Sequence, residues 1–203
     1  MTGALTTRQL LLGALPAFAV GVLSSGLLWL LDTGAELLEH QVWHALPLAL
    51  GVAADSPAWI IGVLTATGLA VGLIVQFVPG HGGHDTATIE FIAPVLPLRD
   101  LPSVAAVIVI GLAGGVSLGP EGPIIAIATA VSAALLARVV PSMTTPVVIM
   151  IAAAATVGAM FGTPVAAALV LTGMLATQGA GGPLWDRLFR PLAAAASGAV
   201  TTL

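Results

Sequence analysis

A single carboxylate, Glu121, lies in the stretch Ser-Leu-Gly-Pro-Glu-Gly-Pro at positions 117–123, between two strongly apolar segments. The glycines and prolines around it predict that one helix ends here and another begins. A helix start offers unpaired N–H groups and the positive end of the helix dipole, and both stabilise an anion. We therefore expect Glu121 to act as a tethered anion that competes with a dissolved one. The residues predicted to form this anion site around it are Gly119, Pro120, Gly122 and Pro123.

A second glycine-rich stretch, Gly-His-Gly-Gly-His at positions 80–84, follows an apolar segment. Its backbone amides could hold an anion, and a histidine adds one N–H donor when neutral and positive charge when protonated. Anion binding here is therefore expected to strengthen as the pH falls. The alternatives are a solvent-facing loop with incidental histidines and a cation site that includes Asp85. The predicted anion-binding residues of the stretch are Gly80, His81, Gly82 and Gly83.

Two other patterns could support different chemistry. Residues 115–119 match Gly-x-Ser-x-Gly, the nucleophile elbow of hydrolases, with Ser117 as the nucleophile. That motif needs a strand before the serine, whereas a long apolar helix is expected here. Glu36, His40 and His44 are spaced four apart and would share one helix face, which permits a metal site or a face turned to water. We predict no enzyme activity, no metal site and no cofactor.

The composition is that of an integral membrane protein, because 58% of the 203 residues are hydrophobic and only 7% are charged. A soluble domain carries about 25% charged residues. No basic patch is present that could neutralise phosphates, so nucleic acid is excluded as a partner. The absence of cysteine rules out disulfides and thiolate metal sites but leaves the redox compartment open.

Several apolar stretches approach the roughly 20 residues that a helix needs to cross a bilayer. The chain is therefore predicted to be all-α and to form one membrane domain over residues 1–203. Between the first two stretches, residues 32–55 carry four carboxylates and no arginine, and a short interfacial helix is expected near 35–46. The predicted membrane helices are 10–31, 58–79, 101–118, 120–139, 145–161 and 164–178, followed by 191–203 as a helix that is cut off.

The five arginines predict the orientation of these helices. With the N-terminus in the cytoplasm and one crossing per segment, all of them fall on the cytoplasmic side, as the positive-inside rule requires. The first apolar run is longer than the hydrophobic region of a signal peptide, so it is read as a retained helix of a multi-pass protein in the cell membrane. The arginines are Arg8, Arg99, Arg138, Arg187 and Arg190.

In order and spacing, these elements resemble the ClC family of chloride channels and proton-coupled chloride transporters. That family has a glycine-rich anion loop, a glycine-rich helix, a Gly-(Lys/Arg)-Glu-Gly-Pro helix start and a helix entered through Phe-x-x-Pro. Here the order is the 80–84 stretch, glycines at 111–119, Pro120-Glu121-Gly122-Pro123 and Phe161-Gly-Thr-Pro164. The resemblance covers about residues 60–178, and Gly-x-Glu-Gly-Pro is its most specific part.

The resemblance implies that Glu121 is a gating glutamate in a chloride path and that the protein is a homodimer with one pore per subunit. It also implies one half of an inverted repeat, because the second half of the family's pore is missing. We expect that half on the same chain or on a second chain. The bilayer and chloride, or a similar small anion, are the expected partners.

Two departures from the family pattern change the expected behaviour. Pro120 replaces the family's cation, so chloride should be attracted less strongly. Residues 165–174 contain no carboxylate where the transporters have a second, proton-relaying glutamate. Passive, channel-like conduction is therefore favoured over proton-coupled exchange. The alternatives are another inverted-repeat anion permease, for sulfate or an organic anion, and more remotely an intramembrane serine hydrolase using Ser117.

Overall fold

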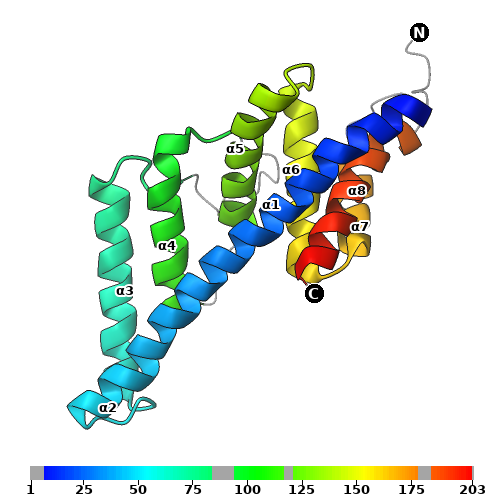
Figure 1. Cartoon of the computed structure of the whole chain (residues 1–203). Helices are drawn as coiled ribbons and strands as arrows, with labels where there is room; N and C mark the ends of the chain where they lie inside the picture. The colour runs from blue at the N-terminus through cyan, green and yellow to red at the C-terminus, as the bar shows by residue number, and fades with distance from the viewer. Residues whose placement is uncertain (1–6, 84–93, 117–120, 178–183, 203) are drawn as a thin grey trace. The chain divides into compact units, whose positions relative to one another are not determined.

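A computed structural model describes residues 7–83, 94–116, 121–177 and 184–202, and every regular element in them is a helix (Figure 1). This confirms the all-α fold predicted from the sequence. A 3₁₀-helix, η2 (Leu98–Asp100), and a π-helix, η1 (Gln41–Ala45), interrupt the α-helices. The α-helices are α1 (Thr7–His40), α2 (Leu46–Leu50), α3 (Pro57–Phe77), α4 (Leu101–Ala113), α5 (Glu121–Val139), α6 (Thr145–Phe161), α7 (Pro164–Thr177) and α8 (Leu184–Thr202).

Three described helical stretches have the length and apolar composition needed to cross a membrane. They are Gly13–Leu50, Pro57–Phe77 and Glu121–Val139. Two further apolar helices, Thr145–Phe161 and Pro164–Gly173, are shorter. Most apolar side chains of α3 are exposed in the described part of the chain, among them Ile61, Leu69 and Phe77, although the helix packs against α4 on one side. In water such a surface would be unfavourable, which agrees with a protein solvated by lipid.

The chain divides into two compact units. Unit 1 comprises Met1–Leu28, Glu90–Val95 and Ile124–Leu203, and unit 2 comprises Trp29–Ile89 and Leu96–Pro123. The boundary passes through α1 and through the first turn of α5. Each unit has its own packing.

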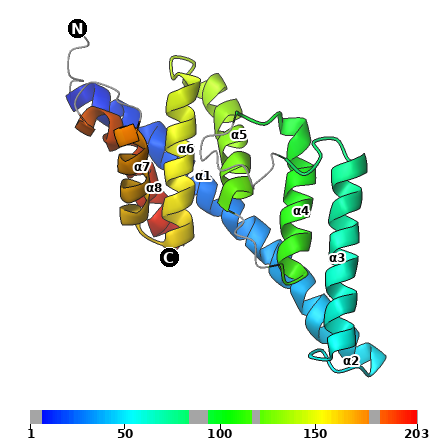
Figure 2. The same cartoon turned by 180° about the vertical axis from the view of Figure 1, so that it is seen from behind.

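In unit 1, α6 packs closely against α8, and α7 packs against both (Figures 1 and 2). Small residues make this close approach possible. Gly158 of α6 lies against the backbone of Ala195, and Gly198 of α8 lies against the backbone of Ala155. Close backbone approach at glycine and alanine is the usual packing of helices in membranes, where lipid provides no hydrophobic driving force.

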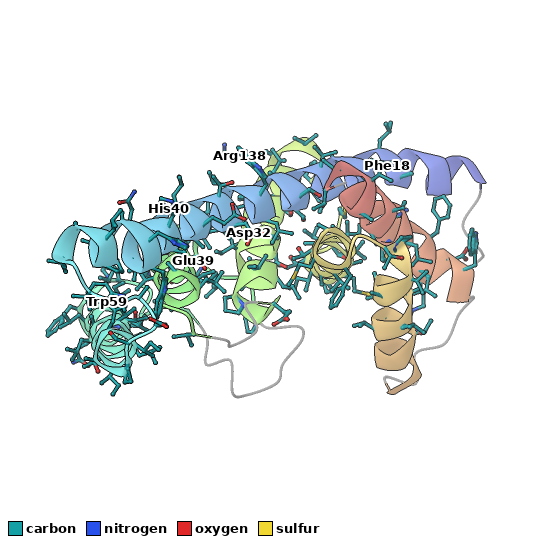
Figure 3. All side chains as sticks on the ribbon, turned by 90° about the horizontal axis from the view of Figure 1, so that it is seen from below. Phe18, Asp32, Glu39, His40, Trp59 and Arg138 are labelled. Carbon is teal, nitrogen blue, oxygen red and sulfur yellow. The ribbon has the colours of Figure 1, made fainter. Side chains whose placement is uncertain are left out.

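Hydroxyl groups join α1 to α8 in the same unit. Ser25 donates to the carbonyl oxygen of Gly198 at 2.8 Å, and Ser197 donates to that of Phe18 at 2.9 Å. Gly21 leaves room for this contact, because a Cβ there would come within 2.6 Å of the Ala194 carbonyl oxygen. On the other side of α1, Phe18 points away from the bundle (Figure 3). One face of α1 is therefore packed and the opposite face is exposed.

In unit 2, α3 and α4 form an antiparallel pair (Figure 2). Thr67 of α3 packs on Gly114 just after α4, while residues following α3 pack on the first turns of α4. The C-terminal end of α4 is capped by a side chain far along the chain, since Trp43 Nε1 of η1 donates to the Ala113 carbonyl oxygen at 2.9 Å. This bond satisfies a carbonyl that has no partner within its own helix.

Three helices differ in their bounds from those expected. The helix predicted over 101–118 ends at Ala113, and Gly114 and Gly115 form a turn after it. The first helix does not end near residue 31 but continues to His40 as a 34-residue α1, passing directly into η1. The charged residues Asp32, Glu36 and Glu39 do not interrupt the helix, because their side chains are exposed on its surface. Residues 32–40 also contain no proline, the residue that is least favourable inside a helix. The last helix begins at Leu184 and carries Pro191 inside it. The assignment of each helix as a membrane crossing stays a prediction.

Candidate anion site

The carboxylate singled out in the sequence lies at a helix start, because Glu121 is the first residue of α5. Gly122 and Pro123 complete the first turn. The missing N–H of Pro123 costs little there, since the first four N–H groups of a helix have no partner within it. Glu121 and Gly122 are exposed. Gly119 and Pro120, also predicted to contribute, lie outside the described residues, as do Ser117 and His84.

The remainder of α5 anchors this helix start. From Ile124 onward half of the side chains are buried, including Ile125, Ala128 and Leu136. The apolar body therefore holds the helix, and its first turn carries a negative side chain beside N–H groups that have no partner within the helix itself. Such an arrangement stabilises the carboxylate by about 0.3–1 kcal/mol when it is exposed. A dissolved anion at the same place would gain from the same N–H groups.

The 80–83 loop has an unusual backbone. Gly80, His81, Gly82 and Gly83 all have positive φ, at 93°, 48°, 74° and 91°. Glycine adopts such values without strain, whereas His81 pays a cost for its left-handed conformation. Gly80 is also restricted sterically, because a Cβ there would lie 2.6 Å from Asp100 Cβ and 2.5 Å from Ser103 Oγ. The loop is thus packed tightly onto the start of α4.

Most of the loop's amide donors are already used within the protein. The N–H of His81 donates to Val78 and that of Gly83 to Gly80, at 3.0 and 2.8 Å. The N–H of Gly82 donates to Ser103 Oγ at 3.4 Å, and Ser103 in turn donates to the Asp100 carbonyl oxygen at 2.8 Å. An anion could use these three amides only after the bonds had opened.

The His81 ring adds one more constraint. Its Nδ1 lies 2.7 Å from the carbonyl oxygen of Val75. Because a carbonyl oxygen can only accept, Nδ1 carries the proton in this contact, and Nε2 of the neutral ring is left as an acceptor. Only the protonated imidazole therefore presents an N–H from Nε2 to an anion. The carboxylate of Asp100, paired with Arg99 at 3.4 Å, adds negative charge near the loop.

No hydrogen bond or ion pair joins Glu121 to the 80–83 loop among the described residues. The third motif, Phe161 to Pro164, forms the turn between α6 and α7. Gly162 there has a left-handed φ of 62°, and Thr163 Oγ1 accepts from the Val165 N–H at 3.3 Å. The structure thus gives each motif its own local geometry, a helix start, a loop and a turn.

The histidines considered for a metal site lie at the end of α1 and in η1. The rings of His40 and His44 are 5.3 Å apart between centroids and tilted. Glu36, the third residue of the predicted face, is exposed, as is His40 (Figure 3). Within the described ranges, no three His, Cys, Asp or Glu side chains are grouped so that they could hold a metal ion. The contact between the His40 and His44 rings therefore lies on the surface and does not by itself make a metal site.

Two residues with a structural part in this region were missed from the sequence. Ser103 links the 80–83 loop to α4, and Trp43 caps the end of α4. Ser103 carries a weak signal, because it follows Pro102 in the first turn of a predicted helix and could bond locally. Trp43 carries none, since its partner is 70 residues away along the chain.

Helices of this length and apolar character are typical of a membrane protein. The chain belongs more specifically to the voltage-gated chloride channel family, whose model matches residues 66–201 and thereby includes Glu121 and the 80–83 loop. The family resemblance noted in the sequence is confirmed by this match.

Curated relatives carry the name "Putative ion-transport protein YfeO". The protein of that name from Escherichia coli O6:H1 is 49% identical over 195 residues, which are 96% of this chain and 46% of the relative. The one from Shigella boydii serotype 4 is 49% identical over the same shares, and that from Escherichia coli strain K12 / DH10B is 48% identical. The chain thus spans about half the length of the curated relatives it matches. No solved structure matches it.

Proposed function

We propose that this chain forms part of a pathway for passive movement of chloride or a similar small anion across the cell membrane, gated by Glu121. The observation that carries the proposal is the position of Glu121 as the first residue of a 19-residue apolar helix, in a chain of the chloride channel family. The ionised carboxylate occupies the anion position at the start of α5. It must be protonated or displaced before an anion binds the same N–H groups.

The relatives support transport as the class of activity, since their printed name describes ion transport rather than an enzyme. Because those relatives are about twice as long, a second half would complete the pathway, and a homodimer with one pathway per subunit follows the family pattern. A cytoplasmic N-terminus, from the distribution of arginines, belongs to the same proposal.

Passive conduction is favoured over proton coupling by the composition of α7. Its sequence, PVAAALVLTGMLAT, contains no carboxylate, so this helix offers no group that could relay a proton from the cytoplasmic side to Glu121. Pro120, in place of a cation, removes one source of attraction for an anion. The proposed conduction is therefore not driven by a proton gradient.

The two glycine-rich stretches contribute differently in this proposal. At the start of α5, the proposed anion-binding residues are Gly122 and Pro123 in the first turn, together with Gly119 and Pro120, which lie outside the described residues. At the 80–83 loop, where the amides of His81, Gly82 and Gly83 already have acceptors, the protonated His81 ring supplies the donor. The loop is thus an acid-dependent secondary anion site.

The test is chloride efflux from liposomes that contain the full-length protein, measured across a range of pH. In Glu121→Gln the side chain keeps its size but loses its charge, so the competitor for the helix start is removed. If the competitor is held by about 0.3–1 kcal/mol, efflux at neutral pH should rise about two- to fivefold. Its increase on acidification should shrink to the part that His81 provides. Glu39→Gln, at an exposed position of α1, is the matched control and should leave the profile unchanged.

Two results would contradict the proposal. An efflux profile of Glu121→Gln identical to that of the wild type would remove Glu121 from the pathway. Uphill proton movement driven by a chloride gradient would show coupled exchange instead of passive conduction. Repeating the efflux with sulfate or an organic anion in place of chloride tests the alternative permease function.

A further inference from the structure

The first turns of α1 and α8 lie toward the same end of unit 1. Near its start, α1 contacts α8 at Gly13, which lies against the Arg190 side chain. Farther along, the Ser25 hydroxyl of α1 donates to the Gly198 carbonyl oxygen of α8 at 2.8 Å. Because residue numbers rise together along this contact, the two helices run in the same direction (Figure 1). The positive dipole ends of both helices therefore point the same way.

Positively charged residues gather at this end. Arg8 belongs to the first turn of α1, Arg187 belongs to that of α8, and Arg190 follows one turn later. In the two segments that meet here, 7–13 and 184–190, the sequence holds these three arginines and one carboxylate, Asp186. Both the side-chain charges and the two helix dipoles therefore favour an anion at this end.

The Arg190 guanidinium is positioned by packing but is not neutralised by the protein. A Cβ at Gly13 would lie 2.8 Å from Arg190 Cζ, so the missing side chain of this glycine leaves room for the group. Its Nε is buried and has no partner, and the guanidinium forms no ion pair within the described ranges. The terminal nitrogens are not among the buried unpaired atoms, and the side chain as a whole is only partly buried. A ligand outside the unit can therefore reach the terminal nitrogens and compensate the charge.

The surroundings of Arg190 are those of a membrane boundary. Its contact residue Gly13 comes three positions after Leu10, where the apolar run of α1 begins. On α8, the exposed Trp185 ring packs against Phe189, with ring centroids 5.5 Å apart. Tryptophan and arginine at the ends of apolar helices are typical of the level at which phospholipid headgroups lie.

We propose that Arg190, together with the first turns of α1 and α8, binds the phosphate of an anionic phospholipid. A guanidinium can bond two phosphate oxygens at once, and the two helix N-termini add positive potential. A lipid is favoured over a free phosphate because apolar side chains continue along α1 from Gly13. Leu15 and Phe18 there are 70% and 49% exposed, and acyl chains would cover them.

The direct test is native mass spectrometry of the full-length protein in detergent, titrated separately with phosphatidylglycerol, phosphatidylcholine and inorganic phosphate. We expect phosphatidylglycerol to bind most tightly. Arg190→Gln should lower its affinity about fivefold, the effect of one arginine near a membrane surface. Arg190→Lys keeps the charge but loses the planar fork, so its affinity should lie between those of the wild type and Arg190→Gln. Arg138→Gln, at an exposed arginine in the last turn of α5, is the matched control and should bind as the wild type does.

Thermal unfolding of the same variants separates a lipid partner from a partner within the protein. Phosphatidylglycerol should raise the unfolding midpoint of the wild type and of Arg138→Gln more than that of Arg190→Gln. A midpoint that Arg190→Gln lowers equally with and without this lipid would give Arg190 a protein partner and overturn the proposal. The proposal is also overturned by an unchanged phosphatidylglycerol affinity in both Arg190 variants, or by inorganic phosphate that displaces the lipid at equal concentration.

Discussion

The contact between α6 and α8 offers the sharpest test of the packing in unit 1. Gly158 faces the backbone of α8, and a Cβ added there would overlap the Ala195 carbonyl oxygen and come to 2.7 Å from its Cα. Ordinary van der Waals contact of a Cβ begins at 3.4 Å, so relief of the contact with the Ala195 Cα alone requires a separation of about 0.7 Å, the difference between these distances. The carbonyl oxygen lies closer and requires more. No side-chain rotation can relieve the overlap, because the opposing atoms belong to the backbone.

The expected effect of Gly158→Ala is a loss of stability. Overpacking of this kind costs about 1–3 kcal/mol, and the better helix propensity of alanine offsets at most about 1 kcal/mol of it. A net loss of about 1–2 kcal/mol corresponds to an unfolding midpoint lower by about 2–8 °C. Gly173→Ala is the control, since Gly173 in α7 has no atom within 4 Å of its added Cβ. That substitution should leave the midpoint unchanged or raise it slightly.

The assay is thermal unfolding of the full-length protein in detergent, followed by tryptophan fluorescence, with both variants purified in parallel. A lower midpoint for Gly158→Ala alone would support close backbone contact between α6 and α8. Equal midpoints for the two variants would refute it, because the same chemical change would then have the same effect at a packed and an open position.

Two further predictions concern unit 2. Trp43→Phe keeps an aromatic ring beside Gly115 but removes the N–H that donates to the Ala113 carbonyl oxygen, so stability should fall by about 1 kcal/mol. Trp29→Phe, at a 68% exposed position, should be neutral in the same unfolding measurement, and equal effects of the two would argue against the cap. His81→Gln removes the ring that can gain a proton, so any extra chloride efflux that this ring provides at low pH should disappear, whereas exposed His44→Gln should retain it. An unchanged profile in His81→Gln would exclude the loop as an acid-dependent anion site.

Local features of the sequence were sufficient for several conclusions. The helix start at Glu121 and that at Pro164 follow from glycine and proline, which act through the backbone of their own neighbours. The membrane character follows from composition, because few charged side chains are available to face water. The family follows from the order of short motifs, and none of these conclusions depends on which helices touch.

Only the tertiary structure shows which hydrogen-bond partners and packing neighbours the individual residues have. The sequence predicts free amides in the 80–83 loop, but Ser103, some twenty residues further along, accepts from Gly82. The carbonyl oxygens of Val78 and Gly80 accept from His81 and Gly83. Likewise nothing near Trp43 indicates that its N–H reaches Ala113, and nothing near Gly158 distinguishes it from Gly173. The sequence does not show whether another helix occupies the space beside a glycine, or which acceptor a hydrogen-bond donor finds. Both depend on the helix that packs against that residue in the folded protein.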